Sequence, residues 1–195
     1  MHIRPEARSA RAEARTDGER LVLGVSGSLR EQSVNTAILR AMGRLAPKGI
    51  RFELCDGLDR LPYFSTDLDR DTLPANGAVR QWRDRLREAD AVVVCTPEFA
   101  AGVPGVLKNA LEWTVSSAEF MNKRTAVISA SPTQTGGDKA HASLLLSLGM
   151  LMADVPEAAK LTIPLASKYL NESKEVTDPE LLDRLRAVLA AIVRP

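Results

Sequence analysis

The residues with the greatest potential for chemistry follow a short apolar run, Leu21–Val25. The next ten residues, 26–35, read SGSLREQSVN and supply three serine hydroxyls, a guanidinium and a side-chain amide. A helix is expected to follow, and the free N–H groups and positive dipole at a helix start favour an anion. These donors suit a terminal phosphate, which presents three oxygens. The alternative is that Ser33 only caps the helix and Ser28 only stabilises a turn.

A second candidate segment follows the apolar run Ala91–Cys95. Residues 96–105 read TPEFAAGVPG, and their two prolines and two glycines predict an irregular backbone. Main-chain N–H and C=O groups held in this way suit the edge of a flat polar heterocycle. Glu98 is a candidate general base, with a salt bridge or a subunit contact as the alternative. No histidine or cysteine cluster accompanies it, so we expect no metal site.

A third segment, residues 129–137, reads SASPTQTGG and precedes a helix. Its glycine pair permits close approach of the backbone to a ring, whereas the alternative is a flexible loop before a helix. His141, on that helix, has no partner in the sequence and is given no catalytic role. No Ser–His–Asp set or nucleophile elbow can be argued from the spacing. This absence favours a ligand that brings its own chemistry, such as a flavin.

Short apolar runs alternate with amphipathic segments along the chain. Continuous apolar strands between helices predict a parallel sheet covered on both faces, with ligands beyond the carboxyl ends of the strands. Either the dinucleotide-binding strand order or the flavodoxin-like order 2-1-3-4-5 fits this alternation. The expected strands are Leu21–Val25, Ile50–Cys55, Ala91–Cys95, Ala126–Ile128 and Leu161–Ile163. The expected helices cover Thr36–Leu45, 79–89, 104–115, Leu144–Met152 and 178–192.

The composition narrows the classes of function. The 195 residues are 45% hydrophobic and 26% charged, which is typical of one globular domain. A formal charge of +1 gives no field for nucleic acid, and no apolar run is long enough to span a membrane. The two cysteines, Cys55 and Cys95, suit a reducing cytoplasm. Residues 1–19 are expected to form a flexible extension before a single domain at 20–195.

Four pieces of this sequence, in this order, resemble the NADPH-dependent FMN reductase family, which includes quinone, azo and chromate reductases. The pieces are Gly27–Arg30 with Ser33 and Asn35, then Thr96–Phe99, then Val103–Trp113, then Ser131-Pro132 with Gly136-Gly137. The third piece, with its Pro-Gly-x-Leu-Lys-Asn-Ala-x-x-Trp pattern, is the most specific. The resemblance implies a flavodoxin-like, doubly wound α/β fold with a five-stranded parallel sheet of order 2-1-3-4-5.

The resemblance also implies FMN as cofactor, NADPH or NADH as hydride donor, and a flavin, quinone or azo compound as acceptor. It implies a homodimer or homotetramer, and no residue with a catalytic role, because the flavin carries the chemistry. The residues implied for the FMN phosphate are Ser28, Arg30, Ser33, Val34 and Asn35. Those implied for the ring are Pro97, Glu98, Phe99 and Ala100 on one side, and Ser131, Gly136 and Gly137 on another.

The chain departs from the family at Phe99-Ala100, where members usually have Tyr-Asn. The ring face is kept there, but a hydroxyl and a side-chain amide are lost. Two other functions remain open on the sequence: a flavodoxin-like electron carrier or FMN-binding module without NAD(P)H turnover, and a nucleotide- or phosphosugar-binding domain.

Overall fold

The computed structural model describes residues 18–69 and 77–193. The extension expected at 1–19 lies almost wholly outside the described residues, and the domain boundary at residue 20 stays a prediction. Within the described ranges, no helix is long and apolar enough to cross a membrane.

Five parallel strands form one sheet in the order β2-β1-β3-β4-β5, which confirms the flavodoxin-like order. The strands are β1 Arg20–Ser26, β2 Ile50–Cys55, β3 Ala91–Thr96, β4 Arg124–Ala130 and β5 Lys160–Ile163. The central β3 is buried along its whole length, because helices cover both of its faces. Its AVVVCT sequence is therefore the continuous apolar run that a doubly covered strand needs.

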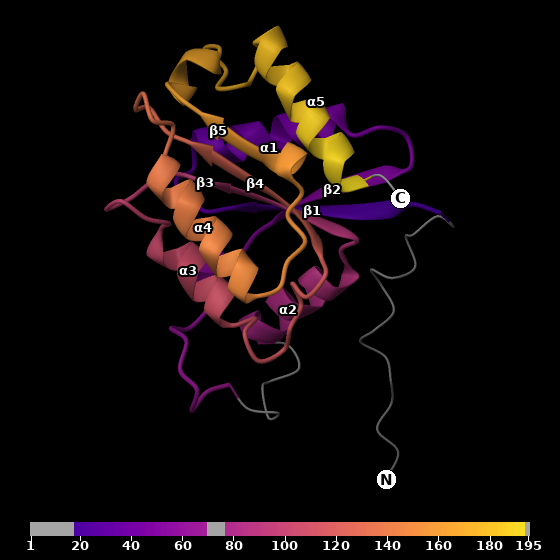
Figure 1. Ribbon diagram of the computed structural model, residues 1–195, viewed down its shortest axis with the longest axis vertical. Coiled ribbons are helices and arrows are strands. Elements are labelled where there is room, and N and C mark those ends of the chain that lie inside the picture. The colour runs from indigo at the N-terminus through magenta and orange to yellow at the C-terminus, as the bar shows by residue number, and fades with distance from the viewer. Residues whose placement is uncertain (1–17, 70–76, 194–195) are drawn as a thin grey trace.

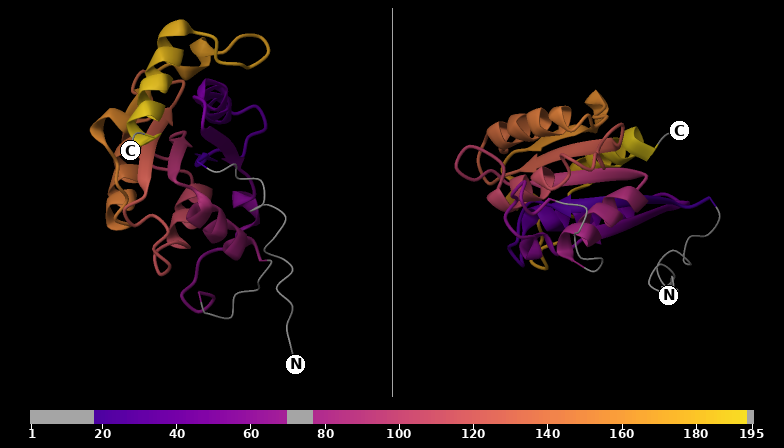
Figure 2. Two further views of the ribbon diagram at one scale, coloured as in Figure 1. Left: turned by 90° about the vertical axis from the view of Figure 1, so that its right-hand side faces the viewer. Right: turned by 90° about the horizontal axis from the view of Figure 1, so that it is seen from below.

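Two helical layers cover the sheet (Figures 1 and 2). The helices are α1 Val34–Leu45, α2 Ala78–Glu88, α3 Gly105–Glu112, α4 Asp138–Met150 and α5 Pro179–Val193. Short 3₁₀ turns lie at η2 Leu58–Arg60, η3 Glu157–Ala159 and η4 Ala166–Tyr169. One apolar core lies between the sheet and α1 with α5, and a second lies between the sheet and α2, α3 and α4.

Helices α3 and α4 differ most from the expected bounds. Helix α4 begins at Asp138, directly after the loop, as expected for the helix that carries His141. The apolar periodicity indicated only its later part, from Leu144, because the first turn is polar. Helix α3 ends at Glu112, before the expected end at Val115, and Val115 is 47% exposed. Trp82 and Trp113 are buried in the core on the side of the sheet that α2, α3 and α4 cover.

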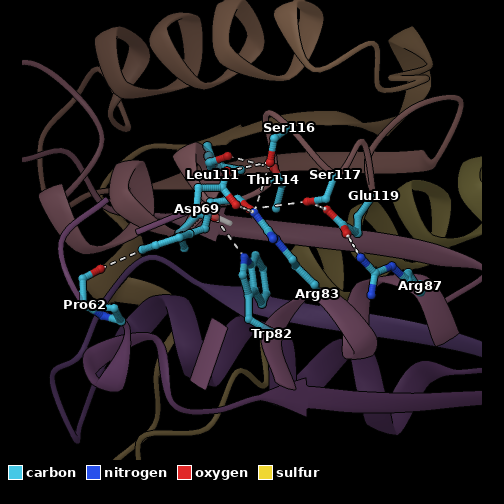
Figure 3. A network of polar contacts seen from close by, with 12 residues as sticks. Pro62, Asp69, Trp82, Arg83, Arg87, Leu111, Thr114, Ser116, Ser117 and Glu119 are labelled. Carbon is cyan, nitrogen blue, oxygen red and sulfur yellow. Dashed lines mark hydrogen bonds and ion pairs between the residues drawn. The ribbon is translucent and has the colours of Figure 1, made fainter. Parts of the chain in front are cut away.

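A network of polar contacts ties α2 to the segments around it (Figure 3). The buried Arg83 donates from Nε to the carbonyl of Trp113 at 2.7 Å and pairs with Asp69 at 2.8 Å. Its guanidinium also lies 5.8 Å from the centre of the Trp113 ring. Because a buried guanidinium must have its donors satisfied, this arrangement fixes the end of α3 against α2 and the chain at Asp69.

The segment that follows η2 is held by α3 itself. The Pro62 carbonyl accepts from Asn109 Nδ2 at 3.0 Å and from Trp113 Nε1 at 2.8 Å. The Oδ1 atom of Asn109 accepts from the Phe64 amide at 2.8 Å, and the Phe64 and Trp113 rings pack edge to face. The Asn and Trp of the family pattern, four residues apart, thus share one face of α3 and clamp residues 62–64.

Candidate functional site

The sheet brings the three candidate segments to one edge of the molecule. Strand β1 pairs with β3 and β3 pairs with β4, with Ser26 beside Cys95 and Thr96 beside Ser129. Because all strands are parallel, the segments that follow β1, β3 and β4 leave neighbouring carboxyl ends. In Figure 1 the loops that follow β3 and β4 project together at the left of the view. This is the edge at which doubly wound sheets bind ligands.

The start of α1 leaves two backbone donors free for an anion. Ser33 is the N-cap: its Oγ accepts from the Thr36 amide at 3.4 Å, and its carbonyl accepts from the Ala37 amide at 2.9 Å. The first four N–H groups of a helix have no intrahelical partner, so the Val34 and Asn35 amides remain available. The N-cap that the sequence allowed as an alternative is therefore present, and it leaves these two amides without an intrahelical partner.

The rest of the loop after β1 is held by serine hydroxyls. The Ser28 amide donates to Ser26 Oγ at 3.3 Å, and Ser28 Oγ accepts from the Arg30 amide at 3.3 Å. Ser26 Oγ also lies 2.9 Å from Thr36 Oγ1, which ties the loop to α1. The exposed Arg30 guanidinium has no ion-pair partner within the described residues. An exposed cation beside free helix-start amides fits a phosphate.

The side chain of Asn35 points into the protein instead. Its Oδ1 accepts from the Cys95 thiol at 3.3 Å, and its Nδ2 donates to the Ala130 carbonyl at 3.4 Å. The side chain thus joins α1 to the ends of β3 and β4 and is buried. The Asn35 side chain thus has both of its hydrogen bonds within the protein, and a contact of its main-chain amide with a phosphate stays a prediction.

The loop after β3 contains a tight two-residue turn. Phe99 and Gly102 exchange two backbone hydrogen bonds of 3.0 and 3.1 Å. The residues between them, Ala100 and Ala101, both have left-handed backbones, with φ of 49° and 58°. This is the pattern of a type I′ turn, for which asparagine and glycine are favoured. The Phe99 ring is 59% exposed at this edge, where it can contact a ligand.

Glu98 caps α4 from a distant part of the chain. Its Oε2 accepts from the Lys139 amide at 3.0 Å and from the Ala140 amide at 3.1 Å. The local N-cap, Gly137, has no side chain to do so. This stabilises the start of α4, because a carboxylate satisfies two first-turn amides and the helix dipole together. Glu98 therefore joins the loops after β3 and β4, and within the described residues its carboxylate forms no salt bridge. Its contact with the ring, its role as a base and a subunit contact stay predictions.

The loop after β4 places Ser131 and the glycine pair behind its exposed tip. The buried Ser131 lies with its Oγ 3.0 Å from Thr133 Oγ1. A Cβ on Gly136 would stand 2.8 Å from the Ile163 carbonyl carbon, so this glycine is required by the chain that follows β5. Gly137 has room for a Cβ, but its φ of 85° favours glycine. The pair thus shapes the loop, and its contact with a ring stays a prediction.

The other titratable groups near these loops are not activated. Burial raises the pKa of the Cys55 thiol to about 11, although the Arg85 charge opposes it, and burial raises the pKa of Cys95 still further. Burial lowers the pKa of His141, and the charge of Lys160 adds to this effect. Across 18–69 and 77–193, no group of three or more metal-ligating side chains occurs. These groups offer no nucleophile or metal centre at neutral pH.

The comparison with known proteins decides between the functions that the sequence left open. The sequence model of the NADPH-dependent FMN reductases matches residues 21–168. The chain belongs to this family. It is an oxidoreductase that uses FMN with NAD(P)H, which confirms the expected cofactors and the main function predicted. The alternatives of a carrier without NAD(P)H turnover and of a phosphosugar-binding domain are not favoured.

Individual members agree with this assignment. The chain is 31% identical over 173 residues to an NAD(P)H-dependent FMN reductase of Pseudomonas aeruginosa, covering 88% of this chain and 92% of that protein. It is 34% identical over 140 residues to a quinone reductase of Pseudomonas putida, covering 69% of this chain and 74% of that protein. FerB, a flavoenzyme NAD(P)H:(acceptor) oxidoreductase of Paracoccus denitrificans, superposes with a TM-score of 0.77 at 28% identity, covering 89% and 95%.

Proposed function

We propose that this FMN reductase passes the electrons of NAD(P)H to a quinone or a free flavin. The observation that carries the proposal is the pair of free first-turn amides of α1 beside Arg30, at the carboxyl edge of a 2-1-3-4-5 sheet. The relative from P. putida is a quinone reductase, which supports the acceptor class. The exposed Phe99 ring supports it too, because an aromatic face suits a flat acceptor.

In this proposal the segment after β1 binds the flavin phosphate. The Val34 and Asn35 amides donate to its oxygens, the Arg30 guanidinium neutralises its charge, and the hydroxyls of Ser28 and Ser33 complete the shell. The hydrogen bonds between Ser26, Ser28 and Thr36 keep these groups in position before the ligand arrives, so little ordering cost accompanies binding.

The loops after β3 and β4 bind and orient the ring. Bound FMN supplies hydride acceptance and its onward transfer to the acceptor. Pro97, Phe99 and Ala100 line one side, and Ser131 with Gly137 lines the other. The cap that Glu98 provides holds the two loops at a fixed separation, because one carboxylate contacts amides of α4 while its backbone belongs to the β3 loop.

We also propose that the protein is a cytoplasmic homodimer that pairs through α3 and α4. Leu146 and Met150 are exposed on α4, at 78% and 64%, and Val115 is exposed just after the end of α3. A groove of about 260 Å³ lies between the helices, bordered by the Lys108–Glu112 ion pair. Exposed apolar side chains beside a groove can be self-complementary in a two-fold dimer, because the side chains of each copy can enter the groove of the other. The free thiols of Cys55 and Cys95 suit the cytoplasm.

Anaerobic mixing tests the function directly. FMN-loaded protein mixed with NADPH, and separately with NADH, should lose the absorbance of oxidised flavin, and added benzoquinone or free FMN should restore it. Bleaching that neither acceptor reverses would contradict the acceptor class. A flavin that neither nucleotide bleaches would contradict the donor half of the reaction.

A further inference from the structure

A polar hollow of about 400 Å³ lies beside the predicted phosphate site. One wall is a stripe of α1 that begins at Ser33 and continues through Ala37, Arg40 and Arg44. These positions are three to four residues apart, so they share one helix face. The opposite wall is the turn at residues 173–175, which precedes α5. No residue of the loops after β3 and β4 lines this hollow, so it is not the ring site.

The charge of the hollow favours an anionic ligand. Arg44 is paired with Glu175 at 3.4 Å, which closes one end. Within the described part of the chain, Arg40 and Lys174 have no ion-pair partner, whereas Glu31 is the one lining carboxylate left unpaired. Two unpaired cations therefore face one unpaired carboxylate. Because neither cation is engaged in an ion pair within the described residues, their flexible side chains can both turn toward a phosphate.

The turn that carries Lys174 is held firmly. Asn171 exchanges backbone contacts with Glu175 and Lys174 at 2.9 and 3.0 Å, and its Oδ1 accepts from the Glu175 amide at 2.9 Å. Lys174 itself has a left-handed backbone with φ of 59°, which is unfavourable for a residue with a Cβ. The surrounding hydrogen bonds keep this conformation and direct the turn toward α1, as the Arg44–Glu175 pair shows.

We propose that this hollow binds the phosphate-bearing adenosine half of NAD(P)H, which rests on the proposed function. Its volume lies in the range of small-molecule sites. Arg40 and Lys174 would pair with phosphate oxygens, and a guanidinium plane can stack on adenine. Glu31 would accept from ribose hydroxyls, as acidic residues do in dinucleotide sites. Ser33 belongs both to the hollow and to the flavin phosphate site, so the donor would lie across the start of α1.

Binding of 2′,5′-ADP and of 5′-AMP to the FMN-loaded protein tests this site by calorimetry. We expect both probes to bind, and the double variant Arg40→Ala/Lys174→Ala to weaken them about five- to tenfold, since two exposed charge contacts are lost. The variant should raise the KM for the nucleotide donor by a similar factor and leave kcat and FMN affinity unchanged. Arg186→Ala, an exposed arginine on α5 paired with Asp183, is the matched control and should change none of these.

The other outcomes are distinct. Equal probe affinity in the wild-type protein and the double variant, or no binding of either probe, would overturn the proposal. The proposal would also be overturned if the double variant bound FAD more weakly than the wild type but kept the wild-type KM for the nucleotide donor. The hollow would then bind the adenylate of a flavin dinucleotide. Loss of probe affinity in a protein that never oxidises NAD(P)H would keep the nucleotide site and contradict the proposed function instead.

Discussion

At the scale of single residues, two side chains at the candidate site make other contacts than their chemical type suggests. Glu98 is a carboxylate in a loop predicted to contact the ring, where a base is expected, yet its hydrogen bonds are to amides of α4. Asn35 follows a loop predicted to bind the phosphate, yet its side chain joins Cys95 to Ala130. In both cases the side chain fixes the backbone that presents the donors. The backbone, more than the side chains, is expected to recognise the flavin.

Replacing Glu98 tests its capping role. Glu98→Ala should lower the free energy of unfolding by about 1–2 kcal/mol, the usual cost of losing an N-cap, and should weaken FMN binding because the two loops separate. Glu98→Gln keeps an acceptor and should lose less than half as much. Urea unfolding and FMN titration measure both effects. Equal losses in the two variants would show that the charge, rather than the hydrogen bonds, matters.

Ala100 offers a test of the turn after β3. Ala100→Asn restores the residue usual in the family and suits a left-handed backbone, so we expect stabilisation of a few tenths to about 1 kcal/mol. Ala142→Asn, on an exposed position of α4, is the control and should destabilise slightly because asparagine is a poorer helix former. Thermal unfolding of the two variants distinguishes them; destabilisation by Ala100→Asn would contradict the turn geometry.

At the scale of elements, α3 connects the predicted ring site to the segment that follows η2. Its start follows the loop that is predicted to contact the ring, and its Asn109 and Trp113 clamp residues 62–64. Arg83 of α2 then donates to the Trp113 carbonyl at the end of α3. The family pattern around Lys108–Trp113 thus serves to join elements, because its two specific side chains contact a connecting segment rather than the carboxyl edge of the sheet.

Removing the Asn109 side chain should have a measurable cost. Asn109→Ala leaves the Phe64 amide without its acceptor, and we expect a loss of about 1–3 kcal/mol in stability. Asn109→Asp keeps that acceptor but places a buried carboxylate against the Pro62 carbonyl oxygen, so its loss should be at least as large. Chemical denaturation compares the two variants with the wild type. A loss below about 0.5 kcal/mol in either variant would mean that the Asn109 side chain does not hold the segment.

At the scale of the whole molecule, the sheet order and the position of the site follow from apolar runs, crossover handedness and the family resemblance. The runs at β1 and β3 are long and continuous, so their burial could be predicted from the sequence. The cap of α4 could not, because it comes from Glu98, 41 residues before Lys139 in the chain. The inward turn of Asn35 could not either, since it depends on the ends of two strands distant in sequence.

The apolar face on α3 and α4 leads to a prediction about assembly. The protein should sediment as a dimer at micromolar concentration, and Leu146→Glu should give a folded monomer, because a charge would be buried without a partner at the interface. Leu29→Glu replaces an equally apolar exposed residue outside this face and should leave the dimer intact. A wild-type monomer, or dissociation by both variants alike, would rule out this interface.

The most direct test is to compare FMN with riboflavin, which lacks the phosphate, by quenching of flavin fluorescence. If the start of α1 binds the phosphate, FMN should bind at least about tenfold more tightly, and Arg30→Ala should weaken FMN by about tenfold while leaving riboflavin unchanged. Arg186→Ala should alter neither affinity. Equal affinity for FMN and riboflavin, or an Arg30→Ala variant that binds FMN as well as the wild type, would contradict a phosphate site at the start of α1.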